Sequence, residues 1–143
     1  MNRPIAITND SDLTKLRAGD AVEFSGIAYT ARDAAHKRFV AALDAGEPLP
    51  VELRGAAIYY AGPTPARKGE IIGSCGPTTS ARMDDYAPRL LDLGLKIMIG
   101  KGKRSPEVLD AIKRNGAVYL IAVGGAAALI KSRITACEEV AYP

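Results

Sequence analysis

A chain of 143 residues, 48% hydrophobic and 24% charged, is long enough to form one domain with a buried core and has the composition of an ordinary globular protein. Its formal net charge is only +3, and acidic residues are scattered among the basic ones, which argues against a nucleic-acid-binding protein. The two cysteines form no CxxC or zinc pattern, and neither a signal peptide nor a membrane span is visible, so we expect a reduced, cytoplasmic protein without a membrane partner.

The hydrophobic pattern predicts strands that alternate with helices along the chain. The expected strands cover residues 4–8, 22–29, 95–99, 117–123 and 138–142, with one or two further strands within 51–60, and a loop rich in glycine and proline is expected at 61–67. The expected helices cover one turn at 11–16, then 31–45 behind a Thr30 N-cap, a helix from Thr78 or Thr79 to Gly94, then 106–115 behind Ser105, and 126–132. This alternation predicts a single α/β domain over residues 1–143, with a compact mixed sheet and flanking helices.

The most informative stretch runs from residue 69 to 104 and predicts strand, glycine-rich turn, helix, strand and a second glycine-rich turn. Both turns follow strands, where α/β sheets usually bind ligands. Glycines such as Gly76 let the backbone approach a ligand, and a helix N-terminus attracts anions. Thr78 and Thr79 can cap that helix and present hydroxyls, while Arg82 on the same face suits a carboxylate or phosphate. A capped helix with a solvated arginine explains the stretch equally well, and the spacing of a P-loop is absent.

The second turn contains Lys101 between two glycines, which leave its ammonium room to reach a ligand. A tight turn with a solvated lysine is an equal alternative. Together with Lys103 and Arg104 it forms the one dense basic cluster of the sequence, which a small anionic ligand explains. The neighbouring pair Asp84 and Asp85 is expected on a solvated helix face, because adjacent residues on a helix point apart and make a poor metal site.

A third candidate group begins the helix expected at 31–45. Arg32 and His36 are four residues apart, and Asp33 and His36 are three apart, so all three can share one helical face. Arg32 would then bind a carboxylate while Asp33 orients the imidazole of the only histidine. The alternative is a surface helix with polar pairs, each worth roughly 0.2–0.5 kcal/mol.

Several separated segments resemble, in the same order, the β part of class I fumarases and L-tartrate dehydratases. They are ARDAAH at 31–36, AGPTP at 61–65, IGSCGPTTSARMD at 72–84, MIGKG at 98–102 and AVGGAAA at 122–128. The resemblance extends from about residue 22 to the end. It implies a swivelling β/β/α domain, which in this family is either a separate β subunit or the C-terminal part of a longer chain.

The family resemblance also implies a reaction, a partner and a cofactor. The reaction is reversible addition of water to the double bond of a four-carbon dicarboxylate. An α subunit contributes three cysteines that hold an oxygen-sensitive [4Fe–4S] cluster, so Cys75 and Cys137 of this chain are not expected to be cluster ligands. By resemblance, the residues that bind substrate are Arg32, Arg82, Gly76 and Lys101, the catalytic residues are Thr78, Thr79 and Lys101, and Asp33 and His36 support the helix that carries Arg32.

Fumarate hydration to L-malate is the first expectation and tartrate dehydration the second. A non-catalytic anion-binding or assembly module is the alternative from a different class. The family's β part continues some tens of residues past the position of residue 143, so we expect the last segment of the domain to be missing. The isolated chain should be inactive, and the apolar, partly basic face expected toward the α subunit could also drive it to form a homo-oligomer.

Overall fold

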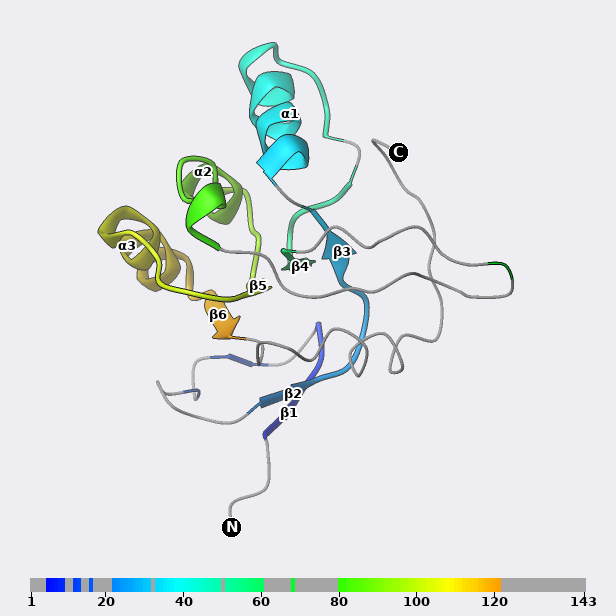
Figure 1. The fold of residues 1–143 in the computed structure, drawn as a ribbon, viewed down its shortest axis with the longest axis vertical. Helices are drawn as coiled ribbons and strands as arrows, with labels where there is room; N and C mark the ends of the chain where they lie inside the picture. The colour runs from blue at the N-terminus through cyan, green and yellow to red at the C-terminus, as the bar shows by residue number, and fades with distance from the viewer. Residues whose placement is uncertain are drawn as a thin grey trace.

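The computed structural model describes residues 5–9, 12–13, 16, 22–31, 33–49, 51–60, 68 and 80–121, and the fold is given for these. The strands are β1 (Ile5–Ile7), β2 (Val22–Phe24), β3 (Tyr29–Thr30), β4 (Ala57–Tyr59), β5 (Ile97–Gly100) and β6 (Val118–Ile121) (Figure 1). The helices are α1 (Asp33–Asp44), the short 3₁₀ helix η1 (Ser80–Met83), α2 (Ala87–Asp92) and α3 (Pro106–Asn115).

Four strands form one sheet in the order β3-β4-β5-β6, and β1 pairs with β2 in a second, two-stranded sheet. The sheet was expected to be mixed, whereas every pairing among the described strands is parallel. Parallel neighbours need a crossover connection, which helices usually supply, and here α2 and α3 lie between successive strands of the four-stranded sheet. The predicted α/β domain with flanking helices is confirmed.

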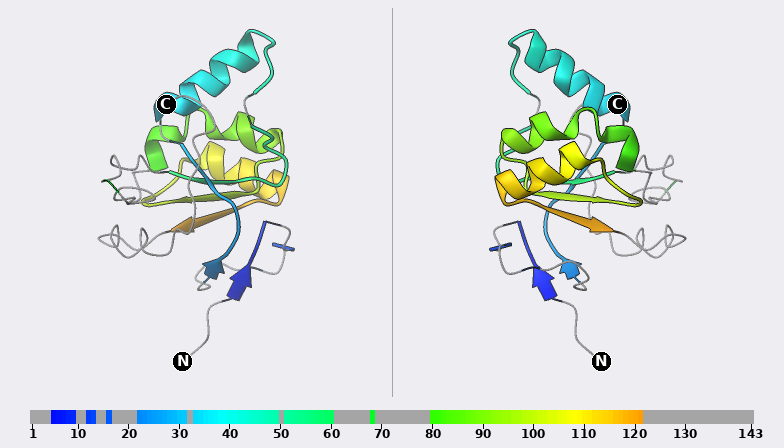
Figure 2. Two further views of the ribbon diagram at one scale, coloured as in Figure 1. Left: turned by 90° about the vertical axis from the view of Figure 1, so that its right-hand side faces the viewer. Right: turned by 90° about the vertical axis from the view of Figure 1, so that its left-hand side faces the viewer.

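Alternating residues of the central strands point to opposite faces of the four-stranded sheet. Ile58 and Met98 belong to the apolar cluster under the helices, whereas Ala57 and Ile97 belong to a second cluster with Ile7 of β1. Figure 2 shows the same arrangement as layers, with the helices on one side of the sheet and β1 and β2 on the other. Because both faces are covered, strand β4 is buried throughout, as expected for a central parallel strand.

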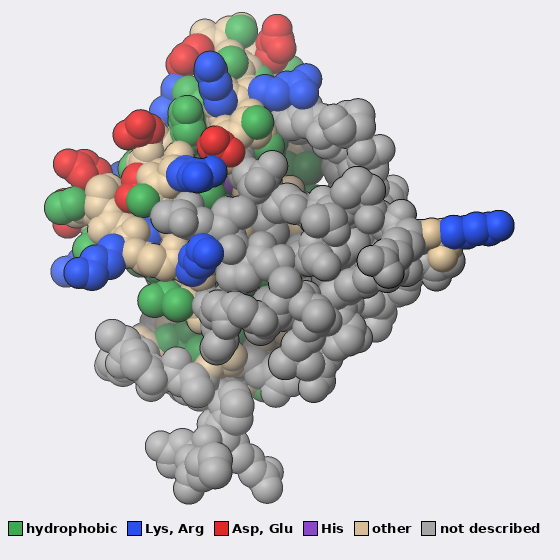
Figure 3. All heavy atoms as spheres, viewed as in Figure 1, with side chains coloured by type: hydrophobic (Ala, Val, Ile, Leu, Met, Phe, Trp, Pro, Cys, Tyr) green, Lys and Arg blue, Asp and Glu red, His purple; other side chains and the backbone are tan. Residues whose placement is uncertain are grey.

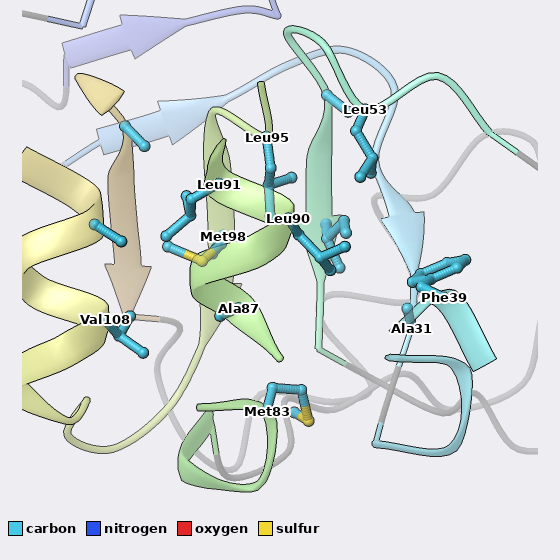
Figure 4. Packing of buried hydrophobic residues seen from close by; sticks show 14 of the residues in the cluster. Ala31, Phe39, Leu53, Met83, Ala87, Leu90, Leu91, Leu95, Met98 and Val108 are labelled. Carbon is cyan, nitrogen blue, oxygen red and sulfur yellow. The ribbon is translucent and has the colours of Figure 1, made fainter. Parts of the chain in front are cut away.

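The larger cluster forms where α2 and α3 pack on the sheet (Figure 4). Leu90 and Leu91 of α2 and Val108 of α3 are 0% exposed, and Met98 of β5 lies beneath them at 0%. Removing a large apolar side chain of this kind from water contributes about 1.5–3 kcal/mol to folding. These contacts fix the two helices, and therefore the chain segments that precede them, relative to the sheet.

The limits of α3 are those expected from the sequence. The Ser105 hydroxyl accepts a hydrogen bond from the Val108 N–H at 3.4 Å, and Pro106 occupies the first turn, where its missing N–H has no cost. Gly116 ends the helix in the left-handed conformation, at φ 62°. Gly94, expected after the preceding helix, also has a positive φ of 109°.

One strand predicted at 22–29 is in fact two, because β2 and β3 belong to different sheets. Gly26, at φ 145°, turns the chain between them. The side chain of Asn9 holds this turn, since it donates to the Ile27 carbonyl and accepts from the Ile27 N–H, both at 2.9 Å. Thr30, predicted as an N-cap, instead pairs with Tyr59 as the last residue of β3, and α1 begins at Asp33.

The helix predicted from Thr78 or Thr79 to Gly94 is also divided. Within the described residues, η1 covers 80–83, a turn follows, and α2 begins at Ala87. Pro88 explains the break, because a proline inside a helix lacks the N–H for the ladder and its ring collides with the carbonyl four residues earlier. Proline is tolerated only in the first helical turn, where α2 places it.

Other predicted elements were too long or lie outside the described residues. Strand β4 occupies only the end of 51–60, where one or two strands were predicted, and β6 is partly rather than fully buried. The predictions for 61–67, 126–132 and 138–142 fall outside, as does half of 11–16. Within the described ranges, no helix is both long and apolar enough to cross a bilayer.

Candidate functional site

The carboxyl ends of the four parallel strands lie along one edge of the sheet. Strand β3 ends at Thr30, which pairs with Tyr59 at the end of β4, and β5 ends at Gly100, which pairs with Ile121 at the end of β6. Open α/β sheets bind ligands at this edge, in loops that follow the strands. In sequence, Lys101 follows β5 directly, and the predicted Arg32 is the second residue after β3. Arg32 itself lies outside the described residues.

Lys101 and Arg82 are carried by two segments that a backbone hydrogen bond joins. The Ser80 N–H donates to the Lys101 carbonyl at 2.9 Å, so the start of η1 is bonded to the chain just after β5. We call this contact between Ser80 and Lys101 the junction. Both cationic residues are exposed. Gly76, Thr78 and Thr79 precede this junction in sequence and lie outside the described residues, so their predicted roles stay predictions.

Gly100 is required for this close approach. A Cβ at this position would collide with the Ser80 hydroxyl oxygen and lie 2.8 Å from Cδ2 of Tyr60. Real Cβ atoms essentially never come so close to other atoms. Gly100, which precedes Lys101, therefore lets η1 pack on the end of β5. This steric role is separate from the backbone flexibility that a glycine gives to a turn.

Beside these segments lies a polar group that we call the Arg104 cluster, in which Tyr60, Ser80 and Arg104 are buried and Asp84 and Tyr119 are partly buried. The Arg104 guanidinium donates from Nε to Asp84 at 2.7 Å and from Nη2 to the Tyr60 hydroxyl at 3.1 Å. Its carbon Cζ lies 5.0 Å from the ring centre of Tyr60 and 4.8 Å from that of Tyr119. Arg104 is therefore held by charge, hydrogen bonds and two aromatic rings.

Two sequence interpretations need correction here. Asp84 was expected on a solvated face, and Arg104 was grouped with Lys101 and Lys103 as part of a basic cluster open to an anion. In the structure the side chains of Arg104 and Asp84 are only 1% and 13% exposed and neutralise each other. The second Asp84 oxygen also accepts the Ser105 N–H at 2.8 Å, so the carboxylate connects η1 to the start of α3.

Tyr119 of β6 connects the same two segments from the opposite side. Its hydroxyl donates to the Gly102 carbonyl at 2.8 Å and lies 2.7 Å from the Ser80 hydroxyl. A phenol has a single proton to donate, so the Ser80 hydroxyl is the donor in the second bond. The Tyr119 side chain thus hydrogen-bonds both Ser80, which follows Thr79, and Gly102, which follows Lys101.

Burial determines the ionisation of both phenols. Removal from water raises the pKa of Tyr60 to about 12, although the Arg104 charge opposes this shift. Burial also raises the pKa of Tyr119, against the hydrogen bond from Ser80. Both hydroxyls are therefore protonated near neutral pH and available as donors.

His36 and Asp33, predicted to share one functional face of α1, have different surroundings. His36 is 0% exposed, and its ring lies edge-on to Phe39 and Tyr60, with ring centres 5.9 and 5.4 Å away. Asp33 is exposed. His36 thus packs the first part of α1 against Tyr60 of the Arg104 cluster, which holds the helix after Arg32 near the carboxyl edge of the sheet.

The described residues offer charges for an anion but no metal site. No three His, Cys, Asp or Glu side chains among them lie close enough to hold a metal ion, and Cys75 and Cys137 fall outside the described ranges. Acidic and basic side chains intermingle over the helices (Figure 3), and several of them pair, as Arg89 does with Asp44 at 2.7 Å. Arg82 and Lys101, beside the junction, leave net positive charge there once Arg104 and Asp84 have neutralised each other.

Residues 2–143 match the family model described as the fumarase C-terminus. The chain belongs to this family. It is 39% identical over its whole length to the aerobic class I fumarate hydratase of Escherichia coli strain K12, and likewise 39% identical to fumarate hydratase 2 of Leishmania major. It is 38% identical, over 92% of its length, to a putative L(+)-tartrate dehydratase subunit beta of Methanocaldococcus jannaschii.

The chain spans only part of these relatives. It covers 26% of the E. coli fumarate hydratase and 25% of the L. major enzyme. It covers 69% of the M. jannaschii subunit. The predicted family, that of the class I fumarases and tartrate dehydratases, is confirmed by the family match and by these identities.

Proposed function

We propose that this chain is the β subunit of an iron–sulfur hydro-lyase that hydrates fumarate reversibly to L-malate. The observation that carries the proposal is the pair of exposed cations, Arg82 and Lys101, on two bonded segments at the carboxyl edge of the sheet. Two positive charges on a fixed frame suit a substrate with two carboxylates. The full-length similarity to class I fumarate hydratases supports this choice of substrate.

The proposed site is completed by another chain. One relative is named as a subunit beta, which supports an α-subunit partner for this chain. We place the [4Fe–4S] cluster on that partner, where it would supply a Lewis acid to the substrate hydroxyl and carboxylate. The described part of this chain has no ligand set for it, so the chemistry assigned to this chain is that of its own cations and hydroxyls.

Each proposed residue has a defined task in the reaction. Arg32, Arg82 and Lys101 neutralise the carboxylates and stabilise the extra negative charge that develops on one of them when the neighbouring carbon loses its proton. Gly76 allows the backbone to approach the substrate. Thr78 or Thr79, with Thr78 preferred, handles the transferred proton. A hydroxyl can do so only where surrounding cations depress its pKa.

Tartrate dehydration is the second candidate, and the M. jannaschii relative favours it because the chain covers more than two thirds of that subunit. The substrates differ in hydroxyl groups rather than in carboxylates, so the same cations would serve both. A non-catalytic anion-binding or assembly module is the alternative from another class. We place the complex in the cytoplasm, without nucleic acid or membrane as a partner.

The proposal is tested by anaerobic assay of the chain with an α subunit of the same family, after iron–sulfur reconstitution. Fumarate hydration should appear only in the mixture, and Arg82→Ala or Lys101→Ala should lower kcat/KM by about 10²–10³-fold, as expected for loss of a charge that stabilises the transition state. Arg89→Ala is the matched control, because this exposed arginine of α2 pairs with Asp44 on α1. Its activity should equal that of the wild type.

The other outcomes separate the alternatives. Activity on tartrate alone would keep the mechanism and change the substrate. Inactivity on both dicarboxylates in a complex with an intact cluster would favour the binding module. Equal losses in the Arg89→Ala and Arg82→Ala variants would remove Arg82 from the site.

A further inference from the structure

Tyr119 of β6 forms hydrogen bonds to two of the segments that carry the proposed site residues, although it is not itself one of those residues. The strand β6 that carries it follows α3 and has no sequence-predicted site residue of its own. Its hydroxyl nevertheless bonds Ser80, which follows Thr79, and Gly102, which follows Lys101. The two candidate segments lie 22 residues apart in sequence (Ser80 to Gly102), and one phenol oxygen connects them.

We propose that Tyr119 is a positioning residue that sets the placement of Lys101 relative to η1, which begins at Ser80 and carries Arg82. The kinetic part of this inference rests on the proposed function, whereas its structural part does not. Tyr119 need not touch substrate, because it acts through the Gly102 carbonyl on one side and the Ser80 hydroxyl on the other.

Three further contacts make the connection rigid. The Ser80 N–H donates to the Lys101 carbonyl at 2.9 Å, so the two segments are already adjacent and the phenol fixes their relative rotation. The Tyr119 ring lies 4.8 Å from the Arg104 guanidinium carbon, and Arg104 is anchored by Asp84. At Gly100, a Cβ would collide with the Ser80 hydroxyl, so this hydroxyl lies close against the end of β5.

The arrangement accounts for why a tyrosine rather than a phenylalanine stands in β6. Apart from its hydroxyl, the ring would pack against the apolar cluster in the same way. Only the hydroxyl supplies a donor for the Gly102 carbonyl and an acceptor for Ser80 at once. Errors of about 1 Å in the placement of a reacting group can lower the rate by about 10²-fold, so the loss of two such bonds should be visible in the kinetics.

The test compares Tyr119→Phe with Tyr29→Phe in the complete chain, bound to its α subunit. Tyr29 is the matched control, because it is another partly buried tyrosine of the same sheet that packs on the same cluster. The first measurement is hydrogen exchange of the Ser80 amide, with the Tyr60 amide, which donates to the Ile99 carbonyl at 2.8 Å, as an internal reference. In Tyr119→Phe the Ser80 amide should exchange about tenfold faster while the Tyr60 amide keeps its rate.

The second measurement is the division of the kinetic effect between KM and kcat. Tyr119→Phe should raise KM for fumarate at least about fivefold, whereas a smaller fraction of folded enzyme would lower the apparent kcat and leave KM unchanged. In a Lys101→Ala background the same change should have a much smaller effect, because the group that Tyr119 positions is absent. Ser80→Ala, which keeps the bond to Gly102, should raise KM less than Tyr119→Phe.

The outcomes distinguish this inference from the proposed function. An unchanged Ser80 exchange rate in Tyr119→Phe overturns the inference, whatever the activity. Faster exchange with wild-type KM and kcat also overturns it, because the connection would then have no effect on the site. If the wild-type complex acts on no dicarboxylate, the proposed function fails, and the exchange comparison alone decides whether Tyr119 holds the two segments together.

Discussion

At the scale of single residues, Asp84 and Arg104 form the least exposed of the ion pairs in the described part of the chain. Its side chains are 13% and 1% exposed, so little water is available to solvate either charge alone. Asp84→Ala leaves the buried guanidinium uncompensated, and we expect a loss of about 3–5 kcal/mol in the free energy of unfolding. Denaturant-induced unfolding at neutral pH measures this loss.

The neighbouring Asp85 provides a matched control. It carries the same charge one residue away but is exposed, so Asp85→Ala should change the free energy of unfolding by less than about 0.5 kcal/mol. Asp84→Asn keeps an oxygen acceptor for Arg104 and should cost less than Asp84→Ala. It serves as the second variant if the alanine form does not fold. Similar losses in the Asp84→Ala and Asp85→Ala variants would show that the pair has no special contribution.

The different positions of these adjacent aspartates also explain why Asp84 was misinterpreted. On a continuous helix both would face solvent, and the sequence pattern suggested such a helix. The structure ends η1 at Met83 and turns the chain there, which points Asp84 inward toward Arg104. The partner lies 20 residues further along the chain, so no local spacing rule identifies it.

At the scale of elements, the turn between α2 and β5 depends on a glycine for two separate reasons. Gly94 has φ 109°, and a Cβ at this position would lie 2.8 Å from Cα of Arg54, which is backbone and has little freedom to move. Gly55 also has a positive φ, of 74°, but a Cβ there meets nothing within 4 Å. A substitution at Gly55 therefore tests the cost of the positive φ alone, whereas a substitution at Gly94 adds the steric collision with Arg54.

We expect Gly55→Ala to lower the free energy of unfolding by about 1–2 kcal/mol, the cost of a left-handed conformation for a residue with a Cβ. Gly94→Ala should lower it by about 1–3 kcal/mol more, because the collision with Arg54 forces the backbone to shift. Thermal or denaturant unfolding of the two variants measures the difference. Equal costs would mean that the Arg54 backbone yields without strain.

Elements with strong local signals could be predicted from the sequence, and those set by tertiary contacts could not. Helix α3 was predicted with its serine cap, its proline and its final glycine, because each of these acts through its nearest neighbours. The division of 22–29 between two sheets depends on Asn9, which lies 18 residues from Ile27. Helix α2 is short because Pro88 restricts its start to Ala87. The spacing of the leucines nevertheless predicted one longer helix.

At the scale of the whole molecule, the sequence predicts where a ligand site would lie, but it does not show which residues hold the segments that carry the candidate side chains. Two glycine-rich turns that follow strands predicted a ligand site at strand ends, and the described strands, parallel where a mixed sheet was expected, have their carboxyl ends along one edge. The predicted residues are polar and lie near glycines, whereas the supporting tyrosines stand within or beside apolar strands. In the sequence, Tyr60 and Tyr119 resemble ordinary core residues. Their polar role depends on contacts with Arg104, which lies 44 residues from Tyr60 in the chain.

Burial of these two tyrosines makes the stability of the whole chain depend on alkaline pH. The pKa of Tyr60 is raised from 10.0 to about 12 by burial, so between these values the folded chain retains a proton that the unfolded chain has released. A raised pKa contributes stability that is complete below about pH 10 and is lost as the pH rises toward 12. A shift of two pKa units corresponds to about 3 kcal/mol in the free energy of unfolding.

The Tyr60→Phe variant isolates this contribution. It lacks the proton at issue, so the difference in free energy of unfolding between the wild type and Tyr60→Phe should be constant up to about pH 10 and then fall by about 3 kcal/mol toward pH 12. Denaturant unfolding at a series of pH values, followed together with phenolate absorbance, measures it. Tyr119→Phe should give a smaller change in the same direction, because its half-buried ring is desolvated less. Parallel curves for the wild type and Tyr60→Phe would mean that Tyr60 ionises without cost to the fold, and that water reaches the Arg104 cluster.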